Sequence, residues 1–134
     1  MLKQLSIYAE NKKGALQALT NALYEAGINI WGSVTNDGAE YGINRMVVSD
    51  PDKAKEVLTE KGYLCRFVDV LAVEIEDKPG ALNTLLTALL DSNVNVDYTY
   101  LSFNRDSSTP VMILHTVDPE EVELCLKAKG FKMC

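Results

Sequence analysis

Two short stretches of the sequence combine residue types that could bind an amino acid. "NKKGAL" starts at Asn11 and "DKPGAL" starts at Asp77, and each stands between a strand-like alternation and apolar residues at helical spacing. A helix opened by Gly14 or Gly80 offers backbone N–H groups and a partial positive charge, which suit a carboxylate. A side-chain oxygen beside that helix start can accept a hydrogen bond from an ammonium group. These are the two charged ends of an amino acid.

The same two stretches also have a purely structural explanation. Asn11 and Asp77 can accept backbone hydrogen bonds near a helix start, and Pro79 can set φ for the first helical turn. The glycines then only permit a tight entry into the helix. The residues of the turns by themselves leave both explanations open.

Both stretches belong to a longer internal repeat. When Leu5 is aligned with Leu71, nine identical residues recur at an offset of 66, from Glu10 over Glu76 to Asn29 over Asn95. The match resumes at an offset of 68, with "DP" at 50 and 118 and with "GY" at 62 over "GF" at 130. The chain is therefore two copies of one unit, and two residues are gained within the second hairpin.

Each copy reads as strand, helix, strand, strand, helix, strand. Gly27 and Asn93 are expected to end the first helix of each copy, and Pro51 and Pro119 suit the first turn of the second helix. The hairpin loops are expected at "NDGAE" (36–40) and at the longer "NRDSST" (104–109). "YLCRFVDV" and "FKMC" are expected to be the closing strands.

This pattern predicts an α+β protein of two ferredoxin-like βαββαβ repeats, each an antiparallel sheet with its helices on one face. The predicted domains are residues 1–69 and 70–134. The junction "FVDVLAVEI" is mostly apolar and holds no Gly, Ser or Pro, so the last strand of one unit is expected to run almost directly into the next unit. We expect the two units to be rigidly packed.

Composition argues against several classes of function. The chain has 134 residues, a net charge of −6 and scattered basic residues, so nucleic acid is not an expected partner. No run of about 18 apolar residues and no signal peptide is visible, which favours a cytoplasmic protein without membrane contact. Catalysis needs a nucleophile with a base, a metal cluster or a phosphate cradle, and none is visible. We expect no enzyme activity, no cofactor and no metal.

The remaining candidate residues have plain structural interpretations. Cys65, Cys125 and Cys134 form no CxxC pair and are expected to be reduced structural thiols, with Cys125 as a small buried residue in place of Val57. His115 is expected to be packed on a strand or at its edge, and Trp31 to be a packing residue. Tyr98 and Tyr100 share one face of a strand, but the basic residues of an RNA-binding platform are missing.

The repeated unit resembles the ACT domain, a small amino-acid-sensing module attached to many enzymes of amino-acid metabolism. "NKKGAL" and "DKPGAL" carry the resemblance at the first turn, and "AGINI" and "SNVNV" carry it at the second strand. In ACT domains like those of serine-regulated phosphoglycerate dehydrogenase, an Asn in the turn of one unit and an Asn at the second strand of another hold the effector. The resemblance pairs Asn11 with Asn95 and Asp77 with Asn29. Because Asp77 replaces an amide, the two sites are expected to be unequal.

The resemblance implies a small-molecule sensor that binds an amino acid or a related acid at the interface between its two repeats. The alternative is a non-catalytic regulatory subunit or interaction module that docks an amino-acid-metabolism enzyme and has no ligand of its own. The expected partners are an amino-acid effector and either a second copy of the chain, in a homodimer, or a metabolic enzyme. The family's His before the turn is absent, so the effector stays open. The predicted ligand-binding residues are Asn11, Lys12, Lys13, Gly14, Ala15, Leu16, Asn29, Ile30, Asp77, Lys78, Pro79, Gly80, Ala81, Leu82, Asn95 and Val96.

Overall fold

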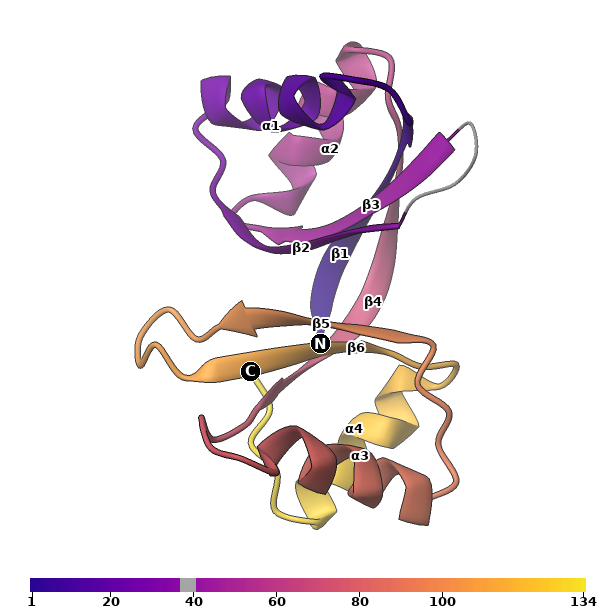
Figure 1. The fold of residues 1–134 in the computed structure, drawn as a ribbon, viewed down its shortest axis with the longest axis vertical. Helices are drawn as coiled ribbons and strands as arrows, with labels where there is room; N and C mark the ends of the chain where they lie inside the picture. The colour runs from indigo at the N-terminus through magenta and orange to yellow at the C-terminus, as the bar shows by residue number, and fades with distance from the viewer. Residues whose placement is uncertain (37–40) are drawn as a thin grey trace. The chain divides into compact units, whose positions relative to one another are not determined.

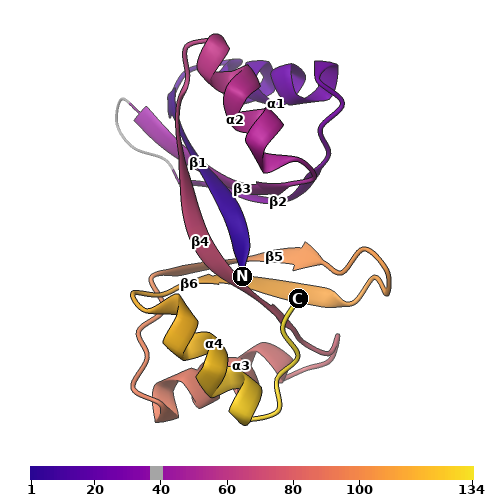
Figure 2. The ribbon, with the colours of Figure 1, turned by 180° about the vertical axis from the view of Figure 1, so that it is seen from behind.

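The structure is a computed structural model that describes residues 1–36 and 41–134. Its helices and strands follow the predicted repeated order (Figures 1 and 2). The first copy contains β1 (Leu2–Glu10), α1 (Ala15–Glu25), β2 (Ile30–Asn36), β3 (Tyr41–Val48), α2 (Pro51–Glu60) and the start of β4 (Leu64–Glu74). The second copy contains the end of β4, α3 (Ala81–Asp91), β5 (Tyr98–Phe103), β6 (Pro110–His115) and α4 (Pro119–Ala128).

The chain divides into two compact units. The first repeat unit is Lys3–Val68, and the second repeat unit is Asp69–Cys134 together with Met1–Leu2. The division falls inside β4, which is one continuous strand of 11 residues. The last strand of the first repeat therefore continues directly as the first strand of the second, as the apolar junction predicts.

Each unit has the predicted ferredoxin-like arrangement, with two helices on one face of an antiparallel sheet (Figure 1). The strand order is β2-β3-β1-β4 in the first repeat unit and β4-β6-β5 in the second. The closing segment of the second unit is shorter than predicted, because only an isolated bridge joins Met133 to Val73. Two backbone hydrogen bonds flank that bridge, from Glu74 N to Lys132 O at 2.9 Å and from Cys134 N to Ala72 O at 2.8 Å.

The two cores are built from equivalent positions. Alternate residues of the first strand of each copy point inward, as period-2 spacing requires, and the helices add leucines from their buried faces. The shared core positions are fully or almost fully buried in both units: Leu5 and Leu71, Ile7 and Val73, Leu19 and Leu85, Leu23 and Leu89, Leu58 and Leu126. The turns and helix ends of each copy are therefore positioned by the core of that copy.

All four helices end in the same hydrogen-bonded motif, in which a left-handed residue follows the last turn. At the end of α1, Gly27 has φ 73°, its N–H donates to Tyr24 O at 3.0 Å, and the N–H of Ile28 donates to Leu23 O at 3.0 Å. Asn93 takes the same place after α3 with φ 58°. Both predicted helix ends are confirmed, and Pro51 and Pro119 open α2 and α4 as predicted.

The strand registers locate the two residues that the second copy gains. Asn36 pairs with Ile43 in the first unit, and Ser102 pairs with Val111 in the second. The offset between copies is 66 before the loop and 68 after it, so both extra residues lie in the β5–β6 loop. The hairpin loop predicted at 36–40 falls, after Asn36, outside the described residues. None of the helices within the described ranges is long and apolar enough to cross a membrane.

Two substitutions at Gly27 test the left-handed conformation at the end of α1. We expect Gly27→Ala to lower the free energy of unfolding by about 1 to 2 kcal/mol, because an alanine at positive φ is strained. Gly27→Asn should cost less, because asparagine already holds this conformation at position 93. Urea unfolding of the full chain measures both, and equal losses for the two variants would contradict the account.

Candidate functional site

The two strand-to-helix turns have the same backbone structure. Lys12 O accepts from Ala15 N at 3.1 Å, and Lys78 O accepts from Ala81 N at 3.3 Å. The third residue of each turn is a left-handed glycine, Gly14 with φ 83° or Gly80 with φ 88°. A turn with positive φ only at this position is a type II turn, which favours Pro at its second position and Gly at its third.

This geometry corrects part of the structural explanation given by the sequence. The residues at the N-cap positions are Gly14 and Gly80, not Asn11 and Asp77, which lie three residues earlier. Pro79 does not lie in the first helical turn, because α3 begins at Ala81. Pro79 instead occupies the second position of the type II turn, where its fixed φ is also favourable.

A cavity of about 560 Å³ lies at the first of these turns, and we call it the first turn cavity. It carries an excess of positive charge, because Lys12, Lys13 and Lys61 line it together with Glu10. Lys12 pairs with Glu10 at 3.0 Å, so Lys13 and Lys61 supply the excess. Its lining consists of Tyr8, Ala9, Glu10, Lys12, Lys13, Gly14, Ala15, Ala18, Lys61, Gly62 and Tyr63.

Backbone donors of α1 begin at this cavity. The N–H of Ala15 is engaged by the turn, and the carbonyl of Gly14 accepts from Ala18 N at 2.9 Å. The next two N–H groups, of Leu16 and Gln17, have no partner inside the helix, as at every helix start. Together with the helix dipole they favour a negative group at this end.

The second turn cavity, of about 420 Å³, occupies the equivalent place in the second repeat unit. Glu74 lines it where the first copy has Tyr8, and Lys132 lines it where the first copy has Leu64. These two side chains pair at 3.1 Å, and Lys78 pairs with Glu76 at 2.7 Å. The charges of these four side chains cancel in pairs, so the second turn cavity lacks the positive excess of the first.

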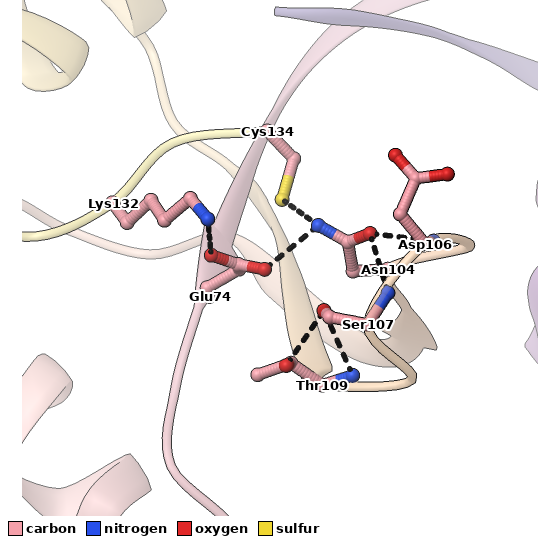
Figure 3. Close-up of polar contacts among 7 residues, drawn as sticks. All are labelled: Glu74, Asn104, Asp106, Ser107, Thr109, Lys132 and Cys134. Carbon is pink, nitrogen blue, oxygen red and sulfur yellow. Dashed lines mark hydrogen bonds and ion pairs between the residues drawn. The ribbon is translucent and has the colours of Figure 1, made fainter.

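The longer β5–β6 loop is fastened beside the second turn cavity (Figure 3). Asn104 Nδ2 donates to Glu74 Oε1 at 2.7 Å, and Asn104 Oδ1 accepts from the N–H of Asp106 at 2.9 Å. Thr109, at the end of this loop, lines the cavity. The loop that contains the two gained residues thus also contains Asn104, whose side chain hydrogen-bonds to Glu74.

Asn29 and Asn95, which follow α1 and α3, line cavities other than the turn cavities of their own units. Asn29 lines a cavity of about 420 Å³ together with Ile30 and α1, and its N–H donates to Ser49 Oγ at 2.9 Å. Asn95 lines a cavity of about 420 Å³ between the end of α3 and the start of α4, which we call the exit cavity. Its Nδ2 donates to Asp97 Oδ1 at 3.2 Å. The pairings of Asn11 with Asn95 and of Asp77 with Asn29 join residues of different units and stay predictions.

Nine of the sixteen predicted residues line one of these cavities, and the nine are divided among four cavities. Within the described residues, Asn11 and Leu16 are absent from the lining of the first turn cavity. The lining of the second, over the same part of the chain, lacks Asp77, Pro79, Gly80 and Leu82. Val96 is partly buried against the core of the second unit. The sequence reading missed the loop that follows the second helix, although the matching "KGY" (61–63) and "KGF" (129–131) were visible in the repeat.

Other side chains considered from the sequence have structural roles. His115 is packed, as predicted: its ring stacks on Tyr98 with centroids 4.9 Å apart, and Nδ1 lies 2.9 Å from Asp97 Oδ2. The three cysteines are free thiols, and burial raises the pKa of Cys65 and of Cys134. Cys125 is only partly buried, contrary to the prediction, because it lines the exit cavity, where its Sγ donates to Ser92 Oγ at 3.2 Å.

Comparison with known proteins decides the family. The family model of the ACT domain pair matches residues 1–130. The chain belongs to the ACT domain pair family. ACT domains are regulatory modules that bind amino-acid effectors, and the recognition of two ACT repeats from the sequence is confirmed.

Solved structures share the fold of this chain. The crystal structure of protein BT0572 from Bacteroides thetaiotaomicron has a TM-score of 0.90 and 31% identity, over 99% of this chain and 91% of that chain. The ligand-free regulatory subunit of aspartate kinase from Thermus thermophilus has a TM-score of 0.65 and 14% identity, over 96% and 94%. The corresponding subunit from Thermus flavus has a TM-score of 0.61 and 19% identity, over 96% and 91%, so both subunits share the fold. No curated protein matches the sequence.

The polar cluster at the second turn gives a pH-dependent prediction for this ACT pair. The hydrogen bond from Lys132, and secondarily that from Asn104, holds the pKa of Glu74 below its ordinary value of 4.5. The lowered pKa means that Glu74 contributes stability above its unfolded pKa and loses it as the pH falls through the folded pKa.

We expect Lys132→Met to raise the pKa of Glu74 toward its ordinary value. An NMR titration of the Glu74 carboxyl carbon measures this change. Lys129→Met is the matched control, because Lys129 is an exposed lysine of the same segment outside the cluster. An unchanged titration of Glu74 in Lys132→Met would show that the ion pair does not set this pKa.

Proposed function

We propose that this ACT pair is a regulatory sensor whose first turn cavity binds the carboxylate of an amino acid or a related acid. The observation that carries the proposal is the coincidence of a helix start with an excess of lysines in one cavity of about 560 Å³. Gly14 and Ala15 bring the positive end of the α1 dipole to the lining, and Lys13 and Lys61 supply charge.

The ammonium end of the effector requires hydrogen-bond acceptors. The amide oxygens of Asn11 and Asn95 have the right chemistry for this end, and the family resemblance pairs these two residues. Asp77 with Asn29 forms the second predicted pair, in which a carboxylate replaces the family amide. We therefore propose that amide oxygens of this kind bind the ammonium end of the effector.

The two sites are proposed to be unequal. At the second turn, Glu74 would repel an incoming carboxylate, and its bond to Lys132 occupies the cation that could offset this repulsion. At the first turn, the equivalent positions are Tyr8 and Leu64, which carry no charge at neutral pH. We propose that effector binding at the first turn is the tighter of the two.

Docking to an amino-acid-metabolism enzyme is a second candidate function, and an exposed apolar stripe favours it. Leu82, Leu86 and Leu90 recur every four residues on α3 and are 38%, 37% and 75% exposed. Residues at this spacing lie on one face of a helix, opposite in role to the buried Leu85 and Leu89. Sensing and docking are compatible, because a regulatory module must also contact the protein that it regulates. In either function the chain is proposed to carry out no reaction.

A thermal unfolding scan against the twenty amino acids separates the two functions. An effector at about 100 times its dissociation constant adds about 2.7 kcal/mol to the free energy of unfolding, which raises the melting temperature. We expect one amino acid or a few related ones to raise it. No shift with any member of the panel would favour docking without an effector.

Replacement of a cavity lysine tests the role of the first turn. We expect Lys61→Gln to weaken binding of the effector by about two- to fivefold, because one exposed ionic contact contributes roughly 0.5 to 1 kcal/mol. Lys129→Gln is the matched control, since Lys129 holds the same place after α4 and lies outside the lining described for the second turn cavity. Calorimetry with equal affinity for both variants would contradict the assignment.

The pairing across the repeats is tested by Asn95→Ala and Asn11→Ala in the same calorimetric assay. The loss of a hydrogen bond to a charged group, about 1.5 to 3 kcal/mol, lowers the affinity about 10- to 150-fold. The unfolding midpoint of both variants should stay near that of the parent chain. Unchanged affinity in both would remove the two asparagines from the site while leaving the lysine result to be judged separately.

A further inference from the structure

The exit cavity of the second repeat unit differs in chemistry from both turn cavities. Residues 92–95 and 116–118 line it together with Glu121, Val122 and Cys125 of α4. Two of the lining side chains, Asp118 and Glu121, are acidic, and this described lining contains no lysine, arginine or histidine. The cavity of about 420 Å³ is therefore suited to a positively charged group.

The lining of this cavity differs in polarity from the equivalent positions of the first copy. The first copy provides the comparison at every position, because the two helices of each unit are aligned without gaps. Four lining residues of the second copy are more polar than their counterparts or reverse their charge: Ser92 for Ala26, Thr116 for Val48, Glu121 for Lys53 and Cys125 for Val57. Val117 for Ser49 changes in the opposite direction, so the exchange of Lys53 for Glu121 is the difference with the clearest chemical consequence.

In the first repeat unit, an ammonium group already occupies the equivalent place. Lys53 Nζ donates to Ala26 O at 2.8 Å, at the C-terminal end of α1. A cation at this end of a helix is stabilised by the exposed carbonyl groups and by the helix dipole. Glu121 replaces this lysine in the second unit, so the chain supplies no ammonium from that position to the end of α3.

Two side chains at the exit cavity, those of Thr116 and Asp118, lack hydrogen bonds that their positions would normally provide. Thr116 is 2% exposed, and its Oγ1 has no hydrogen-bond partner among the described residues. Asp118 is the N-cap of α4 but makes no side-chain cap hydrogen bond, whereas its counterpart Asp50 accepts from Lys53 N at 3.2 Å. Buried hydroxyl groups in proteins are nearly always paired, so an unpaired one beside a cavity points to a ligand.

We propose that the exit cavity binds the primary ammonium group of a small organic ligand. The three N–H donors of an ammonium group match acceptors of three kinds here: the carbonyl at the end of α3, the carboxylates of Glu121 and Asp118, and Thr116 Oγ1. A metal ion is a poorer fit, because the described residues hold no group of three His, Cys, Asp or Glu that could ligate one. The described lining of this site shares no residue with those of the turn cavities. It shares Asn95 with the proposed function, which assigns that residue to the ammonium end of the effector, but it does not require the first turn cavity to bind a carboxylate.

n-Butylammonium chloride is the probe, because it reproduces the side chain of the lysine that the first unit uses. We expect its addition to the full chain to give saturable shifts of the backbone ¹H–¹⁵N signals of residues 92–95, 116–118 and 120–122. Glu121→Lys should abolish these shifts and raise the melting temperature without ligand, because the new side chain takes the place of the probe. Thr116→Val should weaken binding about three- to tenfold through the loss of one hydrogen bond.

Both variants introduce the residue of the first copy, so they are compatible with the fold, and the ¹H–¹⁵N spectrum verifies this. Glu120→Lys is the matched control, because it makes the same charge change at an exposed neighbour outside the cavity lining and should retain binding. Shifts that do not saturate or lie elsewhere, undiminished binding in Glu121→Lys, or an equal loss in Glu120→Lys would each overturn the proposal.

Discussion

The left-handed backbone at Gly14 and Gly80 is the constraint on which both turn cavities depend. It reverses the chain within one type II turn, so the first N–H groups of α1 and α3 lie directly beside the preceding strand. Lysines and glutamates on either side of the turn then meet the loop that follows the second helix, and together they line the cavity. Any residue with a side chain would strain this turn, although the space beside each glycine is open.

The two turns therefore share one backbone conformation but differ in their electrostatic environment. The first turn cavity combines helix donors with a lysine excess, whereas Glu74 and Lys132 neutralise each other at the second. The backbone contributes the same donors in both cases, because the turns and helix starts are equivalent. The difference in net charge comes from Lys13, which Pro79 replaces in the second turn, and from Lys61, whose counterpart Lys129 is absent from the described lining of the second turn cavity.

The repeat made most of the fold predictable from the sequence, because every element had a second copy to support it. Gly27, Asn93, Pro51 and Pro119 were placed correctly, since each has a conformational preference that acts locally. Pro79 was misplaced, because proline suits both a helix start and the second position of a type II turn. The cavity linings were predicted in part only, because Lys61 and Lys132 reach the turns through tertiary packing that no local pattern encodes.

The fusion of both repeats in one polypeptide has an evolutionary consequence. In an assembly of identical single-repeat chains, every mutation would appear in all copies at once, and a change that benefits one surface would be imposed on its equivalent. Here Thr116 and Glu121 coexist with Val48 and Lys53, so the ancestral symmetry of the unit no longer restricts either copy. A single gene can therefore retain one version of a helix exit as a stable structural element while selection reshapes the other.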